Sequence, residues 1–435
     1  MSTATAGRRP TDQWAMPARL AMLGALYFVQ GLPFGFQAKA LPLLLRESGT
    51  TLTAIGWAGA LAAPWALKAL WAPLVDRFGS PRIGRRRSWI LPVQALLVVA
   101  MGLAAALVDQ GPLGALLALI FAMNLLSATQ DIAVDGLAVD LLKPHELGPG
   151  NASQIVGFKL GMEVSGGLLV WASDRIGWSG LFIACAALTA AVWLAVLLLL
   201  RESPPASTET APPRNARDFL TELRRALTLP GTAWLLAVVA TYKIGESLVD
   251  AMFKPFLLDA GMSRGEIGLS IGTVAGLFSI AGSLLGAVSA RRLGLTRSLL
   301  LIGALRVVPL AGIWALAALS GAPATAPDPT WVLVVASAEH LAGGALTTVM
   351  FALMMSRVDR RIAATHFTLL ASVEVIGKSP GSWLSGAMAD AVGYPPVFAL
   401  GAALSLAWLA LMAFARGPLS APATLADVPK GLNQP

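Results

Sequence analysis

The chain has 435 residues, of which 56% are hydrophobic and only 13% are charged, and its mean hydropathy is +0.69. Soluble globular proteins carry about 25% charged residues, so this composition excludes a cytosolic enzyme and a disordered chain. The net charge of +8 would suit a nucleic-acid partner, but the basic residues cluster in short segments between apolar runs. That distribution is typical of membrane topology signals, so we expect no nucleic-acid partner.

Apolar runs long enough to cross a bilayer recur along the whole sequence. About 20 helical residues span the hydrocarbon core, and Gly and Pro are tolerated inside such helices. The first run is too long for a signal peptide and lacks an early cleavage site, so we interpret it as a retained helix. We predict an all-α membrane protein with 12 transmembrane helices, near residues 20–45, 53–74, 89–108, 113–142, 151–173, 179–200, 232–258, 268–288, 298–320, 330–356, 364–388 and 394–415.

The lysines and arginines between these runs are unevenly distributed. Alternate connections, counted from the N-terminus, hold most of them, and the other connections hold only Arg46, Arg175 and Arg264. By the positive-inside rule this pattern places both termini in the cytoplasm.

Residues 201–230 differ from the rest in composition. Two Pro-Pro pairs precede apolar residues at helical spacing, which predicts a linker followed by an amphipathic helix at the cytoplasmic interface. Two similar halves joined by such a loop are typical of transporters built from repeats. The predicted domains are an N-terminal six-helix bundle at 1–200, the linker at 201–230, a C-terminal six-helix bundle at 231–418 and a cytoplasmic tail at 419–435.

The connection after the second span resembles the loop signature of the major facilitator superfamily. It reads Asp76-Arg77-Phe78-Gly79 and then Gly84-Arg85-Arg86-Arg87, with Ala72 in place of the first Gly and an insertion before the basic cluster. In that family the loop latches one conformation of the carrier. The resemblance therefore implies a gating role for Asp76, Arg77 and Arg86, and the alternative is a plain basic loop.

More specific motifs follow in spans four, seven and ten. The segments Ala128-Thr129-Gln130-Asp131, Tyr242-Lys243-Ile244-Gly245-Glu246 and Phe351-Ala352-Leu353-Met354 resemble the AmpG muropeptide permeases and the related acetyl-CoA transporter group. Tyr27-Phe28-Val29-Gln30-Gly31-Leu32-Pro33 is similar to a facilitator-domain-containing branch of that clan. The resemblance implies a major facilitator fold in the bacterial inner membrane and proton-coupled import of an anhydromuropeptide by alternating access. Siderophore uptake and acyl-CoA transport are alternatives on the same fold.

Ionisable residues inside the apolar runs indicate function independently, because a charge at membrane depth is costly unless it is paired or hydrated. Asp131 and Asp135 lie one turn apart on one face, and because two charged carboxylates repel, one is expected to hold a proton. The alternative for Asp135 is a cap in the headgroup region. Span seven carries Lys243, Glu246, Asp250 and Lys254 on one face, at spacings that allow ion pairs along the helix. We predict proton coupling at Asp131, Asp135, Glu246 and Asp250.

Lysines in the spans that would line a transport cavity favour an anionic solute, although enough acids are present to pair every lysine internally. Arg306 is expected to form a structural pair or to reach toward the interface, and His340 and His366 either relay protons or make ordinary hydrogen bonds. The predicted substrate-binding residues are Gln30, Phe34, Gln37, Asn124, Lys159, Glu163, Tyr242, Lys243, Glu339, Glu374 and Lys378.

The sequence contains no Gly-x-x-x-x-Gly-Lys-Ser/Thr phosphate loop and no Cys/His cluster. We therefore expect no catalytic residues, no metal and no cofactor, and we predict that the protein is not an enzyme. A membrane enzyme or a receptor is the remaining alternative, and its acids would lie in the external loops. The expected partners are a small anionic solute, protons and lipid, with the protein acting as a monomer.

Overall fold

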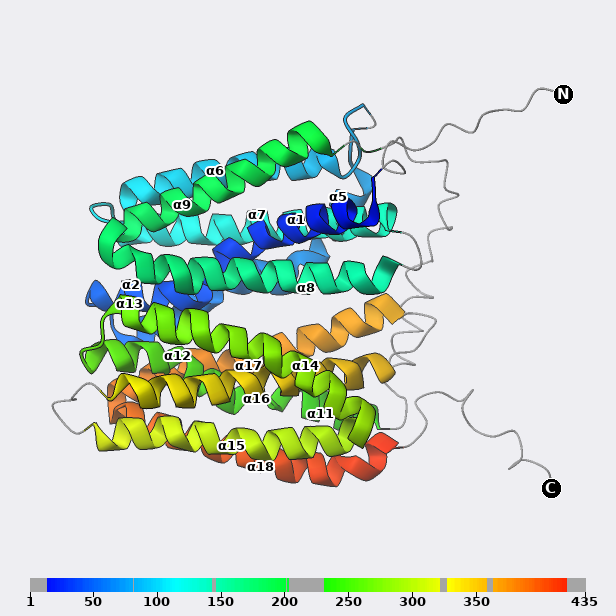
Figure 1. Cartoon of the computed structure of the whole chain (residues 1–435). Coiled ribbons are helices and arrows are strands. Elements are labelled where there is room, and N and C mark those ends of the chain that lie inside the picture. Colours follow the sequence, from blue (N-terminus) through cyan, green and yellow to red (C-terminus); the bar gives the residue numbers. More distant parts are fainter. Residues whose placement is uncertain are drawn as a thin grey trace, which may run out of the picture. The chain divides into compact units, whose positions relative to one another are not determined.

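The computed structural model describes residues 14–80, 82–142, 146–200, 202, 231–320, 327–357 and 363–420. Helices make up nearly all of these residues, and the only β pairing within them is an isolated bridge between Ser80 and Gly84 (Figure 1). The predicted all-α membrane fold is confirmed. The predicted amphipathic helix within 201–230 and nearly all of the tail at 419–435 lie outside the described residues.

Several spans of the first half consist of consecutive helical pieces. The first joins α1 (Met16–Gly35), the π-helical η2 (Phe36–Ala40) and α2 (Leu41–Glu47). The second contains α3 (Leu52–Ala58), η3 (Gly59–Ala62), α4 (Ala63–Leu67), η4 (Lys68–Leu70) and α5 (Ala72–Arg77). The remaining helices are α6 (Arg87–Leu107), α7 (Leu113–Leu141), α8 (Leu147–Glu163), η6 (Val164–Leu168) and α9 (Leu169–Leu199).

The second half begins with a broken span, in which α11 (Thr232–Thr241) and α12 (Ile244–Asp259) are separated by Tyr242 and Lys243. A composite span follows, made of α13 (Arg264–Ile267), η7 (Gly268–Ala275) and α14 (Gly276–Leu293). Four long helices complete this half: α15 (Leu295–Leu319), α16 (Pro329–Ser356), α17 (Ala363–Val392) and α18 (Tyr394–Ser420).

The start of α16 is capped by Asp328. Its side chain accepts a hydrogen bond from the Thr330 N–H at 2.8 Å, which holds the pKa of this exposed carboxyl below its usual value.

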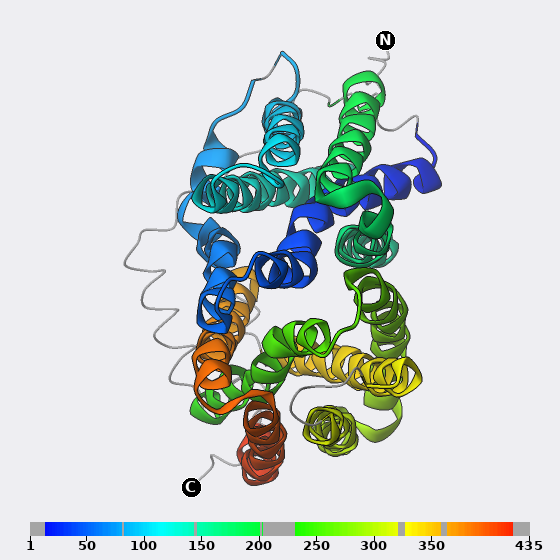
Figure 2. The ribbon, with the colours of Figure 1, turned by 90° about the vertical axis from the view of Figure 1, so that its left-hand side faces the viewer.

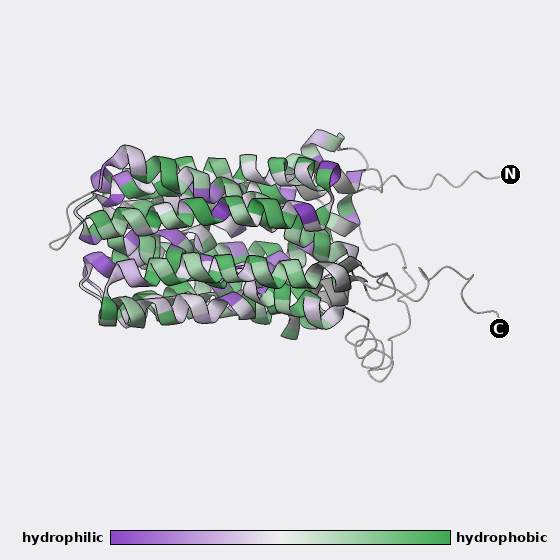
Figure 3. Ribbon diagram, turned by 90° about the horizontal axis from the view of Figure 1, so that it is seen from below, coloured by the Kyte–Doolittle hydropathy of each residue, from purple (hydrophilic) through white to green (hydrophobic). Residues whose placement is uncertain are grey.

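Nine of the described helical segments are long and apolar enough to cross a membrane. One of them, Ser153–Leu199, contains two of the predicted spans, because Gly177 adopts a φ of +71° and breaks the helix there. A shorter apolar helix covers Leu52–Leu67, so the arrangement is consistent with twelve spans. Hydrophobic residues cover most of the helix lengths, as bilayer burial requires (Figure 3).

The chain folds into two compact units. Unit 1 comprises residues 1–41, 61–209 and 264–273, and unit 2 comprises 42–60, 210–263 and 274–435. Unit 1 has an apolar core that includes Leu23, Ile90 and Val134, and the core of unit 2 includes Val238, Val349 and Met412. Figure 2 views many helices nearly along their axes, and within each unit these helices run roughly along one common direction.

Small residues let helix backbones approach closely inside each unit. A Cβ atom on Gly157 or Gly161 of α8 would overlap a carbonyl oxygen of α1, contributed by Gly24 or Phe28. In the same way, a Cβ on Gly282 of α14 would overlap the carbonyl oxygen of Leu341 in α16. Such contacts stabilise membrane helix pairs through van der Waals packing, because lipid supplies no hydrophobic driving force between helices.

Candidate functional site

A row of polar side chains follows one face of α7 in unit 1. The side-chain oxygen of Asn124 accepts a hydrogen bond from the Trp65 indole at 3.0 Å, Asp131 forms an ion pair with Lys68, and the Tyr27 hydroxyl donates to Asp135. The structure therefore gives each of the three α7 residues singled out from the sequence a specific partner on another helix. Lys68, Tyr27 and Trp65 were not predicted to belong to the site.

Three aromatic rings lie beside this row. Phe34, Trp65 and Phe158 have pairwise centroid separations of 5.7 to 5.8 Å, and the Lys68 ammonium lies 5.7 Å from the Trp65 ring centroid. Two of the ring pairs are edge-to-face and the Phe34–Phe158 pair is tilted, and together with the nearby cation they form a surface that is both apolar and polarisable. Phe34, predicted to bind substrate, thus belongs to an aromatic cluster.

The other predicted residues of unit 1 are distributed around these two groups. Gln30 and Gln37 are buried, and both amide atoms of Gln30 and the amide oxygen of Gln37 have no hydrogen-bond partner among the described residues. Glu163 pairs with Lys39 of η2, whose ammonium also donates to the carbonyl oxygen of Gly272 at 3.3 Å. Lys159 is partly buried on α8 and has contacts of its own.

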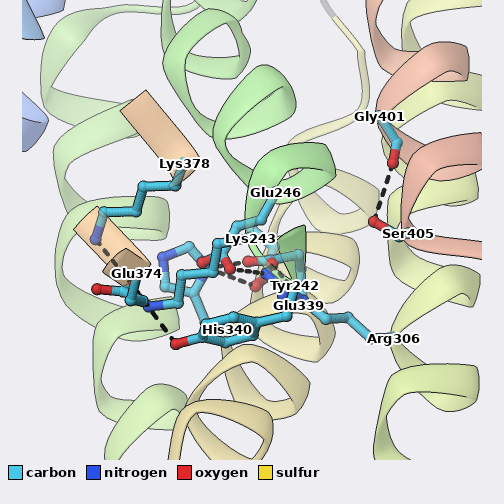
Figure 4. A network of polar contacts seen from close by, with 11 residues as sticks. Tyr242, Lys243, Glu246, Arg306, Glu339, His340, Glu374, Lys378, Gly401 and Ser405 are labelled. Carbon is cyan, nitrogen blue, oxygen red and sulfur yellow. Dashed lines mark hydrogen bonds and ion pairs between the residues drawn. The ribbon is translucent and has the colours of Figure 1, made fainter. Parts of the chain in front are cut away.

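In unit 2, Arg306 lies at the centre of an ion-pair cluster that we call the arginine cluster (Figure 4). Its guanidinium lies 2.8 Å from the Glu246 carboxylate on α12 and 2.5 Å from the Glu339 carboxylate on α16. The Nδ1 atom of His340 lies 3.1 Å from the second oxygen of Glu339. Because the Arg306 side chain is only 3% exposed, its role as a structural pair is the one the structure supports.

A second cluster, which we call the lysine cluster, forms around Glu374 of α17 (Figure 4). Its Oε1 atom lies 3.3 Å from the ammonium of Lys243 and 3.2 Å from that of Lys378, and it accepts a hydrogen bond from the Tyr242 hydroxyl at 3.4 Å. The break between α11 and α12 positions Tyr242 and Lys243 for these contacts. Three predicted substrate-binding residues therefore contact a fourth, Glu374.

Span seven does not form the predicted row of ion pairs in full. Asp250 and Lys254 do pair along α12 at 3.0 Å, but Lys243 pairs with Glu374 and Glu246 pairs with Arg306. The spacing allows a Lys243–Glu246 pair, but the two residues pair elsewhere because the helix break turns Lys243 toward α17. A small pocket lies between α12, α15 and α16, and its polar lining consists of Glu246, Asp250, Glu339 and His340.

The basic loop before α6 is anchored by an acid that the sequence did not identify. The Glu202 carboxylate accepts hydrogen bonds from the backbone N–H groups of Arg86 and Arg87 at 2.8 and 2.9 Å. It thereby satisfies free donors at the start of α6, where an anion is also favoured by the helix dipole. Arg86 is buried and lies 3.5 Å from Asp140. The side chains of Asp76, Arg77 and His366 lie outside the described residues.

Within the described parts of the chain, no group of three or more His, Cys, Asp or Glu side chains could hold a metal ion. The polar groups present are carboxylates, ammonium groups, a guanidinium, amides and hydroxyls. This set can bind a charged, hydrogen-bonding solute and can take up or release protons.

Comparison with known proteins relates the chain to transporters over most of its length. Residues 19–174 match the family model described as acetyl-coenzyme A transporter 1. The chain is 31% identical over 407 residues to the anhydromuropeptide permease of Escherichia coli (strain K12), which covers 92% of this chain and 80% of that protein. It is 25% identical over 414 residues to the putative transporter AmpG 4 of Rickettsia felis, with 91% and 96% covered.

Solved structures share the fold at low sequence identity. A bacterial homologue of the human lysosomal transporter Spinster superposes with a TM-score of 0.68 at 15% identity, over 95% of this chain and 97% of that one. The nucleoside transporter NupG gives a TM-score of 0.69 at 12% identity, over 91% and 99%. These neighbours have the major facilitator fold. The chain is thus a multi-pass membrane transporter, not an enzyme, and it belongs to the AmpG anhydromuropeptide permease family.

Proposed function

We propose that the protein is a proton-coupled secondary transporter that imports an anhydromuropeptide across the bacterial inner membrane by alternating access. The observation that carries this proposal is the 31% identity to the anhydromuropeptide permease of Escherichia coli over 92% of the chain. An anhydromuropeptide combines sugar rings with a peptide that bears carboxylates. Within unit 1, the aromatic cluster offers apolar ring surfaces of the kind on which sugar rings pack. Within unit 2, the lysine cluster offers ammonium groups of the kind that bind carboxylates.

Proton coupling is supported by the balance of charge in two clusters. Asp131 and Asp135 lie one turn apart on α7, and among the described residues Lys68 pairs with Asp131, whereas Asp135 accepts a hydrogen bond from the Tyr27 hydroxyl and has no ion pair. In the arginine cluster, the single guanidinium of Arg306 forms ion pairs with two carboxylates, those of Glu246 and Glu339. Because an excess negative charge is costly at membrane depth, an acid in such a cluster is suited to take up a proton and release it in another conformation.

Acyl-CoA transport is the second candidate function. It is favoured by the match of residues 19–174 to the acetyl-coenzyme A transporter model. Acetyl-CoA and an anhydromuropeptide are both anionic and amphipathic, so the charged clusters are suited to bind either solute.

The test is uptake into proteoliposomes containing the full chain, with an inward proton gradient and radiolabelled anhydromuropeptide. We expect accumulation that a protonophore abolishes and that unlabelled acetyl-CoA or a ferric siderophore does not inhibit. Inhibition by acetyl-CoA, together with accumulation of labelled acetyl-CoA, would replace the first function with the second.

Asp131→Asn and Glu246→Gln remove one acid from each cluster while preserving its size. We expect each substitution to lower gradient-driven uptake at least tenfold. Asp109→Asn is the control, because Asp109 is an exposed residue between α6 and α7. Unchanged uptake in both cluster variants would refute their assignment to proton coupling.

A further inference from the structure

The lysines at membrane depth differ in the number of acids available to them. Lys39, Lys68 and Lys254 contact Glu163, Asp131 and Asp250, so each of them has an acid partner of its own. Lys243 and Lys378, in contrast, share a single carboxylate oxygen of Glu374, at 3.3 and 3.2 Å. With both lysines protonated and Glu374 ionised, the lysine cluster therefore carries one excess positive charge.

The excess charge is accessible on one side of the cluster. The Glu374 side chain is 5% exposed and that of Lys243 is 16% exposed, whereas the Lys378 side chain is 34% exposed. An ammonium group has three N–H donors, and the described residues supply Lys378 with Glu374 as its one acceptor. Lys378 thus keeps donors available for a second anion.

The neighbouring arginine cluster has the opposite balance. There a single guanidinium contacts two carboxylates, those of Glu246 and Glu339, and Glu246 lies only three residues beyond Lys243 at the start of α12. An anion that approaches this part of unit 2 is attracted by the lysine cluster and repelled by the arginine cluster. Discontinuous membrane helices, such as α11 and α12, are a recurrent way of positioning substrate groups.

We infer that Lys378 and Lys243 form the binding site for a carboxylate of the transported solute. Glu374 is the internal anion that holds the two ammonium groups together and partly competes with the solute. This inference rests on the proposed function, because it takes an anionic solute as the cargo. It adds which residues bind the carboxylate of that cargo. It also predicts that substitutions of Lys378 and of Glu374 change the affinity for the carboxylate form in opposite directions.

The experiment measures equilibrium binding of two ligands to the purified full chain in detergent. One ligand is an anhydromuropeptide with free peptide carboxylates, and the other is the same molecule with those carboxylates amidated. The readout is the ratio of their dissociation constants, amide over acid. A variant that merely damages the fold lowers both affinities and leaves this ratio unchanged.

Lys378→Gln is expected to lower the ratio at least tenfold, because the acid form loses an ion pair with the ammonium that the neutral amide form cannot make. Glu374→Gln is expected to raise the ratio at least threefold, since it removes the competing internal anion. Lys254→Gln is the matched control on α12, and it should leave the ratio unchanged. The inference is overturned if Lys378→Gln weakens the binding of both ligands by the same factor.

A second measurement separates this inference from the choice of cargo. Sulfate is titrated against the full chain at constant ionic strength while the thermal unfolding midpoint is recorded. A sulfate-dependent rise that Lys378→Gln abolishes supports the anion site even when neither muropeptide form binds, and in that case only the proposed cargo fails. If the unchanged chain binds neither muropeptide form and sulfate produces no rise, the anion site is rejected.

Discussion

Arg306 joins three helices through one guanidinium, because it contacts Glu246 of α12 and Glu339 of α16 from its own position on α15. Its place in an apolar run made it conspicuous in the sequence, and either a paired or a snorkelling arginine was compatible with that position. Its partners lie 60 and 33 residues away along the chain. No local pattern could identify them, and only the packing of α12, α15 and α16 does.

Substitution of two buried glutamines, Gln30 and Gln94, tests whether Gln30 binds substrate or is only part of the protein interior. The side chains of Gln30 on α1 and Gln94 on α6 are fully buried, and their amide atoms have no hydrogen-bond partner among the described residues. A buried polar group left without a partner costs about 1–3 kcal/mol. Of the two, only Gln30 is predicted to bind substrate.

Replacement of either glutamine by methionine, which is similar in size and apolar, is expected to raise the thermal unfolding midpoint in detergent. Gln30→Met should also lower anhydromuropeptide uptake at least fivefold, whereas Gln94→Met should leave it unchanged. Uptake and melting curves of the same preparations check both effects. Full uptake by Gln30→Met would remove Gln30 from the substrate site.

At the scale of helices, the structure shows a close glycine contact on α8 and a break inside the span predicted at residues 232–258. Gly157 and Gly161 recur on one face, and this local pattern predicts the close approach of another helix. The break at Tyr242 and Lys243 has no such signal, because no Pro or Gly occupies those positions. At this helix break, Tyr242 and Lys243 both contact Glu374, which lies more than 130 residues later in the sequence.

Gly161→Ala tests the contact between α1 and α8. The added methyl group would overlap the Phe28 carbonyl oxygen, which belongs to the backbone of α1, so the two helices must move apart. We expect a loss of about 1–3 kcal/mol, seen as a lower unfolding midpoint. Gly102→Ala on α6 is the control, since a Cβ there meets no atom within 4 Å, and this substitution should be neutral or slightly stabilising. Equal midpoints for the two variants would contradict the close packing.

At the scale of the whole molecule, we propose from the distribution of basic residues that both termini are cytoplasmic. Cys185 is buried and is the one cysteine of the chain, so a cysteine-free background requires a single substitution. Gln110 and Arg82 are exposed residues in connections for which the rule predicts opposite sides of the membrane.

In a Cys185→Ser background, Gln110→Cys should react with a membrane-impermeant maleimide in intact spheroplasts. Arg82→Cys should react only after the membrane is permeabilised. Mass shifts on a gel measure both reactions, and the reversed pattern would contradict cytoplasmic termini.

We also expect the protein to be a monomer. Light scattering of the purified chain in detergent checks this expectation.

The sequence alone determined the all-helical membrane class, the approximate spans, the glycine-rich helix faces and the polar residues that lie at membrane depth. Hydropathy and helical periodicity are properties of neighbouring residues, so they can be read without knowledge of the fold. The tertiary structure decided which charges meet. It assigned Glu374 to two lysines, Arg306 to two acids and Glu202 to the start of α6. These contacts form between segments that are distant along the chain, because each buried charge must find an opposite charge or a hydrogen-bond partner within the packed helices.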